Sequence, residues 1–245
     1  MATGTYLLPI GAAPIVLPST TAYINSQVSI VGSADFTNPN IEVSARFHVG
    51  SGYYEQTTDS EPTMAGNLTL KHLTLGHGTE GNVIQVDFYG TVTIESCRIE
   101  NVACGGSCNG GAPLTVRGGT AVVRDSTFAN CVGGGSGAVW IASTGAYIGG
   151  EYTEFLPTVT FIGVDMTNNH GGNDSGYGGA VSVVDGSVTF TQGSISGSSN
   201  GAAITAWGGS VDVSGTTFSG NSAEYYGTDG NPNCKARPPG TILGC

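Results

Sequence analysis

A few residues of types that can do acid–base chemistry occupy neighbouring positions of a repeated pattern. Lys71, Glu95 and Arg124 share one position in three successive repeats, and His72 and Asp125 occupy the next position. Sugar-cleaving chemistry needs carboxylates gathered on one face beside a base. One interpretation is therefore a catalytic patch of Glu95, Asp125, Arg124 and His72. We favour the other, a ladder of opposite charges between paired strands, because such ladders are common and support register.

Hydroxyl side chains fill two other positions of the same pattern, the first and the third. Threonine is a favourable residue on exposed strand surfaces, so these columns can be purely structural. Columns of like side chains on a flat face can also form a binding face. Trp140, predicted to point outward from a different strand, is added as a contact for sugar or protein. The candidate binding residues are Thr69, Thr91, Thr93, Thr158, Thr160, Ser187, Thr189 and Trp140.

These positions belong to a nine-residue segment that recurs at intervals of 23 to 38 residues. Its second and fourth residues are apolar, as in Val92 and Ile94, and its ninth is large and apolar. Such alternation predicts a strand with one buried face, and regular recurrence of one unit is typical of a solenoid. The segments are residues 67–75, 91–99, 120–128, 158–166, 187–195 and 210–218.

Between these segments, glycine-rich turns lead into a second set of short strands. We expect those at residues 83–86, 113–116, 139–142, 181–184 and 203–206, with an inserted loop over 146–157. Like strands of successive coils should pair in parallel, about 4.8 Å apart. The sequence therefore predicts one β-helix domain over residues 27–221. Residues 1–26 are expected to form an irregular N-terminal cap, and residues 222–245 a disulfide-tied tail that covers the last coil.

Cysteine usage favours an oxidising compartment, because an even count in a lysine-poor β chain suggests disulfides. Repeat alignment places Cys131 one coil after Cys97 and Cys104, so neighbouring coils could be joined there, and Cys234 and Cys245 would close the tail. Cys104 and Cys108 have zinc-like spacing, but no second pair completes four ligands, so no metal or cofactor is expected. The disulfide candidates are Cys97, Cys104, Cys108, Cys131, Cys234 and Cys245.

Charge and hydropathy narrow the possible partners. The formal net charge of −11 disfavours nucleic acid and anionic membrane, which attract clustered cations. No apolar run approaches the roughly 18 residues of a membrane span. The N-terminus lacks the basic stretch of a signal peptide, so a signal was either removed or never present. Asn67 and Asn173 begin N-glycosylation sequons.

Short motifs inside the repeats resemble those of a known family. Phe128–Asn130, Gly137–Val139, Gly178–Val181 and Phe218–Asn221 are similar to the GGA(I/L/V) and FxxN repeats of chlamydial polymorphic outer membrane proteins. Related repeats occur across the wider pectin-lyase-like group. The resemblance covers about residues 67–222 and implies a right-handed parallel β-helix that acts as a surface passenger, often adhesive. The threonine columns separately resemble the ice-binding face of β-helical antifreeze proteins.

Together these patterns predict an all-β, single-stranded right-handed parallel β-helix of about seven coils. We expect a non-catalytic, secreted or cell-surface module that presents rigid faces to a protein or carbohydrate, or to copies of itself. The alternative is a polysaccharide-active lyase or hydrolase, and the third hypothesis is an ice-binding protein. A uronate-polymer assay of Glu95 and Asp125 variants separates the first two, and an ice-recrystallisation assay tests the third.

Overall fold

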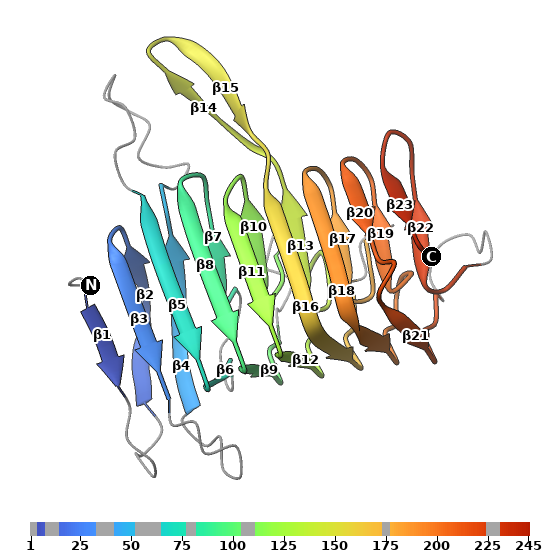
Figure 1. The fold of residues 1–245 in the computed structure, drawn as a ribbon, viewed down its shortest axis with the longest axis horizontal. Coiled ribbons are helices and arrows are strands. Elements are labelled where there is room, and N and C mark those ends of the chain that lie inside the picture. Colours follow the sequence, from blue (N-terminus) through green and yellow to red (C-terminus); the bar gives the residue numbers. More distant parts are fainter. Residues whose placement is uncertain are drawn as a thin grey trace.

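The chain folds into a stack of short parallel strands (Figure 1). The computed structural model describes residues 4–7, 15–32, 42–51, 65–76, 82–103, 111–172, 177–223 and 231–245. Within these ranges every regular element is a strand, and no helix occurs. The described residues accordingly include no helix long and apolar enough to cross a membrane. This arrangement is consistent with a β-helix or solenoid.

One face of the stack, the first face, contains the repeated segments. Its strands pair in parallel with the equivalent strand of the next repeat, as predicted. They are β1 (Gly4–Leu7), β3 (Gln27–Val31), β5 (Gly66–Lys71), β8 (Gly90–Glu95), β11 (Thr120–Arg124), the first halves of β16 (Thr158–Thr167) and β18 (Ser187–Ser196), β20 (Ser210–Asp212) and β23 (Thr241–Leu243).

Two further faces complete each turn of the chain. The second face contains β6 (Thr74–Leu75), β9 (Arg98–Glu100), β12 (Thr127–Ala129), the second halves of β16 and β18, and β21 (Thr217–Ser219). The third contains the ends of β2 (Ile15–Ile24) and β4 (Glu42–Val49), then β7 (Ile84–Val86), β10 (Leu114–Arg117), β13 (Val139–Ala142), β17 (Val181–Val183), β19 (Ile204–Ala206) and β22 (Cys234–Ala236).

The core lies between the faces and consists of the apolar positions of the repeat. Val92, Val159 and Val211 are no more than 1% exposed, which confirms the predicted register. Phe161 and Phe190 stack across neighbouring strands with ring centroids 4.4 Å apart. Each such fully buried side chain contributes on the order of 2 kcal/mol of transfer free energy, so a slip by one residue would expose a whole column.

The nine-residue segments are bent rather than straight. At the sixth position of five of the six segments the backbone takes a positive φ, and the seventh residue can point inward again, as Leu73 and Cys97 do. This turn divides the segment between the first and second faces. The bend residues are His72 (φ 54°), Ser96 (φ 52°), Asp125 (φ 46°), Gly163 (φ 62°) and Gln192 (φ 63°).

Both ends extend the stack further than predicted. Residues 1–26 were expected to form an irregular cap, but β1 pairs in parallel with β3, and the end of β2 pairs with β4. Likewise the C-terminal tail contributes β22 and β23, which continue the third and first faces. The expected covering of the last coil therefore consists of additional strands in the same register.

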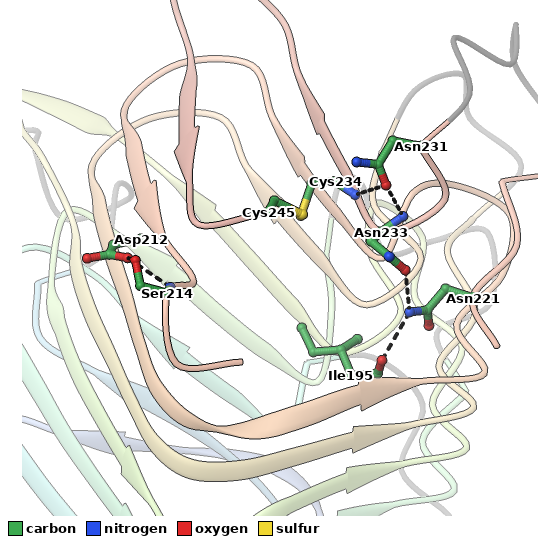
Figure 2. The surroundings of a disulfide bond; sticks show 8 residues. All are labelled: Ile195, Asp212, Ser214, Asn221, Asn231, Asn233, Cys234 and Cys245. Atoms are coloured by element: carbon green, nitrogen blue, oxygen red, sulfur yellow. Dashed lines mark hydrogen bonds between the residues drawn. A yellow bond between two sulfur atoms is a disulfide. The ribbon is translucent and has the colours of Figure 1, made fainter. Parts of the chain in front are cut away.

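The cysteine predictions are partly wrong. Cys234 and Cys245 form the predicted disulfide of the tail (Figure 2). Cys97 and Cys131 instead have free, buried thiols, because each lies in the interior stack of its own coil. Cys104 and Cys108 lie outside the described residues.

The two free thiols are expected to be inert in the native protein. Burial raises the pKa of Cys97 and of Cys131 to about 11, and only the thiolate reacts with alkylating agents. Iodoacetamide at about pH 8 should therefore label neither residue until urea is added. Peptide mass spectrometry assigns the label to individual cysteines. Rapid native labelling of Cys131 would contradict this burial.

Asparagine side chains link successive coils at the end of the second face. Asn169 Oδ1 accepts the backbone N–H of Cys131 (3.1 Å), and its Nδ2 donates to the carbonyl of Phe128 (3.0 Å). Asn221, the asparagine of the FxxN motif, makes the equivalent bonds to Ser198 N–H (2.9 Å) and to the Ile195 carbonyl (3.0 Å; Figure 2). The motif thus satisfies backbone groups of the preceding coil.

Candidate binding face

The first face presents two outward columns of mainly hydroxyl side chains, which we call the hydroxyl face. Strand pairing aligns both columns without a shift from β3 to β20. One column is Gln27, Asn67, Thr91, Thr120, Thr158, Ser187, Ser210 and Thr241; the other is Thr5, Ser29, Thr69, Thr93, Val122, Thr160, Thr189, Asp212 and Leu243.

The hydroxyl face is exposed and nearly free of charge. Its threonine and serine side chains are half-exposed or exposed, and Asp212 is the one ionisable group in the two columns. Residues in one column lie about 4.8 Å apart, and the two columns about 6.7 Å apart, because alternate residues of a strand point the same way. Each hydroxyl can donate and accept hydrogen bonds. The arrangement suits a flat, uncharged partner that itself repeats.

Two of the four candidate catalytic residues, Glu95 and Arg124, form a charged margin beside this face together with Lys71. Lys71 Nζ lies 2.6 Å from Glu95 Oε2, and Arg124 is the next residue in register. Both partners of the ion pair are 34% exposed, so the pair is a surface contact of the predicted ladder.

The remaining two candidates lie at the bend, not on the flat face. Asp125 adopts a positive φ, and its Oδ1 lies over Gly163 of the next coil, 2.8 Å from where a Cβ would be. His72 occupies the same bend two coils earlier. Across the described residues, no group of three His, Cys, Asp or Glu side chains is placed to hold a metal ion.

Trp140 and the sequons are placed differently from the threonines. Trp140 points outward from β13 on the third face, in register with Thr115 and Ser182, and is half-buried. The structure therefore does not bring it together with the hydroxyl face. Asn67 is exposed within that face, so a glycan there would cover neighbouring hydroxyls. Asn173 lies outside the described residues.

An ionic cluster on the third face is not predicted from the sequence pattern. Asp87 is 1% exposed and binds side chains from three coils. His48 Nε2 contacts Asp87 Oδ2, Gln85 Nε2 donates to the same oxygen (2.9 Å), and Arg117 Nε donates to Oδ1 (2.9 Å). Burial raises the pKa of Asp87, but the His48 hydrogen bond and the Arg117 charge outweigh it, so the pKa lies below its usual value.

The contacts of this cluster indicate a structural role, linking β4, β7 and β10, rather than a reactive site. The carboxylate is enclosed by its partners, whereas the His48 and Arg117 side chains are 16% and 31% exposed. A signal was present in the sequence, since Asp87 and Arg117 each follow a predicted second strand. Recognising the cluster would have required the register of the strands on the third face.

No protein-family model matches this sequence, and no curated protein matches it either. What the protein binds must therefore be inferred from its exposed faces.

Proposed function

We propose that this protein is a right-handed parallel β-helix that acts as a non-catalytic, extracellular binding module. Its hydroxyl face would attach to the surface of an uncharged polysaccharide, as at a cell surface. The observation that carries the proposal is the in-register alignment of the two columns from β5 to β18, in which every strand contributes at least one hydroxyl side chain. The disulfide of the tail supports an oxidising, extracellular location.

The composition of the face favours carbohydrate over protein. Protein interfaces depend on buried anchors such as Trp, Tyr and Arg, and the two columns contain none of these residues. An ionic partner is disfavoured because Asp212 is the single charge in the columns. A polysaccharide surface offers repeated hydroxyl groups that can both donate and accept, matching threonine and serine.

Co-sedimentation with insoluble neutral polysaccharides such as cellulose, chitin and β-glucan tests the proposal. Replacing Thr93 and Thr160 together by tyrosine should weaken binding at least about tenfold, or 1.4 kcal/mol, because two bulky rings break the flat surface. Thr217→Tyr is the matched control, since Thr217 is exposed on the second face. Equal binding by the double variant and the control would refute the assignment.

Ice is a second candidate for the same face. Four consecutive rungs, Thr91 with Thr93, Thr120 with Val122, Thr158 with Thr160, and Ser187 with Thr189, form a regular array that a lattice of water could match. The same variants in an ice-recrystallisation assay distinguish the candidates. Inhibition by the wild type that is lost in the double variant, without polysaccharide binding, would favour ice.

A further inference from the structure

The β14–β15 hairpin borders the hydroxyl face. β14 (Thr144–Ile148) and β15 (Glu151–Phe155) form a separate antiparallel sheet between β13 and β16, where an inserted loop was predicted. Figure 1 shows the hairpin projecting beyond the ends of the neighbouring strands. Its last residue, Phe155, lies three residues before Thr158, which begins β16 and belongs to the hydroxyl face. The base of the hairpin is therefore next to that face.

Apolar side chains line the corner where the third face leads into the first. Tyr89, Gly118 and Leu156 each lie two residues before a residue of the hydroxyl face, in three successive coils. Gly118 has no side chain, and Phe155 fills its place, with Cβ 2.7 Å from where a Cβ on Gly118 would be. The following coil has Asp185 at this position. We call Tyr89, Phe155 and Leu156 the apolar strip.

The apolar strip is partly exposed, and its rings are held from below. Phe155 stacks on Phe88 with ring centroids 4.8 Å apart, and Phe88 is 1% exposed. The Tyr89 ring meets Phe155 edge to face at 5.3 Å. Tyr89 and Leu156 nevertheless remain 44% and 58% exposed. Rings that are already fixed lose little freedom when a ligand binds, so this arrangement favours a contact.

Tyr89 adopts a backbone conformation that favours glycine. Its φ is +60°, and the equivalent residue of the next coil is Gly118, with a φ of +75°. A bulky residue at positive φ is rare and costs conformational energy, and residues of this kind gather at functional sites. Glycine would suit the turn better, so the turn itself does not account for an aromatic side chain at position 89.

The apolar strip and the column of Thr91, Thr120 and Thr158 beside it together suit a sugar ring. When the hydroxyl groups of a pyranose are equatorial, they lie around its edge, and its two faces present C–H groups. In a β-linked chain such rings form a flat ribbon. We infer that a ribbon of this kind binds with ring faces on the apolar strip and edge hydroxyl groups on the threonine column, a step that rests on the proposed function of the hydroxyl face.

Co-sedimentation with cellulose measures the contribution of the apolar strip. Tyr89→Gly should weaken binding about tenfold because an anchoring ring is lost, whereas Tyr89→Phe keeps the ring and should bind within about twofold of the wild type. Tyr23→Ala is the matched control, since Tyr23 is 64% exposed and lies on the third face. Wild-type binding by Tyr89→Gly, or equal weakening by the control, would overturn the inference and leave the hydroxyl-face proposal standing.

Two further variants separate binding from folding. Glycine adopts a positive φ without strain, so Tyr89→Gly should be more stable in urea than Tyr89→Ala, although both should bind cellulose equally weakly. Leu156→Ser leaves the turn unchanged and, because Leu156 is mostly exposed, should unfold like the wild type while weakening binding about threefold through lost apolar contact. Unchanged binding by Leu156→Ser and Tyr89→Gly alike would refute the assignment.

Granular starch tests the class of polysaccharide, since it contains a sugar of the same kind joined by α linkages that coil the chain. The wild type should bind cellulose at least about tenfold more tightly than starch. Equal binding to both would overturn the inference alone, whereas absence of binding to every neutral polysaccharide would overturn the proposed function as well. If Tyr89→Gly instead reduces self-association in sedimentation and leaves cellulose binding unchanged, the apolar strip is a contact between copies.

Discussion

Replacing Asp87 by alanine is expected to destabilise the fold by about 3–5 kcal/mol, the cost of breaking a buried ion pair by removing one partner. The carboxylate accepts from His48, Gln85 and Arg117, which lie on three successive coils. Without it, the partly buried Arg117 charge has no counter-ion within the described structure. Urea unfolding followed by circular dichroism measures the loss as a fall in the free energy of unfolding.

The exposed ion pair of the first face is the matched control. Glu95→Ala removes one carboxylate from a pair whose partners are each 34% exposed, and such pairs contribute under about 1 kcal/mol. Asp87→Ala should therefore cost several times as much as Glu95→Ala. If the two variants unfold at similar urea concentrations, the cluster does not stabilise the third face.

The Asp87 contribution should also depend on pH in one direction. Its folded pKa is lowered, so the stabilisation is complete above the unfolded pKa of about 3.9 and is lost as pH falls through the folded value. The difference in unfolding free energy between the wild type and Asp87→Asn should be constant above about pH 5 and shrink below about pH 4. A difference that grows on acidification would contradict the assigned interaction.

The repeat register could be predicted because one face of every strand is buried. Val92, Val159 and Val188 occupy the same position of their segments, and a shift of one residue would turn all of them to solvent. The outward hydroxyl columns follow from the same alternation. That is why the candidate residues on the first face could be placed relative to one another from the sequence, and why Trp140 could be assigned to a different strand, where the structure has it.

The bends could not be predicted from alternation alone. Asp125 and Gln192 adopt the left-handed conformation without being glycine, so nothing marked a corner inside an otherwise regular strand. Asp125 was consequently read as a neighbour of Arg124 on the flat face. A clearer signal exists five residues further on, where Asn101, Asn130 and Asn168 all have positive φ, since asparagine tolerates that conformation best after glycine.

Contacts between residues far apart in the sequence also could not be predicted. His48 and Arg117 lie 39 and 30 residues from Asp87 in sequence. Joining them requires the pairing of β4 with β7 and of β7 with β10. The repeat pattern begins only at residue 67, so the coil that contains His48 had no predicted register. A buried carboxylate of this kind can be recognised only when the strands of the preceding and following coils have been assigned a register.

Asn169→Ala is expected to destabilise the protein by about 2–4 kcal/mol, because two buried backbone groups lose their partners at about 1–3 kcal/mol each. Asn169 is fully buried and bridges the N–H of Cys131 and the carbonyl of Phe128. Thermal or urea unfolding gives the free energy.

Asn221→Ala provides an internal comparison, since Asn221 makes the same pair of bonds one coil from the C-terminal end. Its side chain is only partly buried, so water can satisfy much of what the substitution removes, and the cost should be nearer 1 kcal/mol, that is, about the net value of one hydrogen bond. Amide exchange sharpens the test, because Asn169→Ala should accelerate exchange at Cys131 and leave Ser198 protected. If the two variants lose the same free energy of unfolding, other contacts set the spacing of the coils, and these side chains merely fit that spacing.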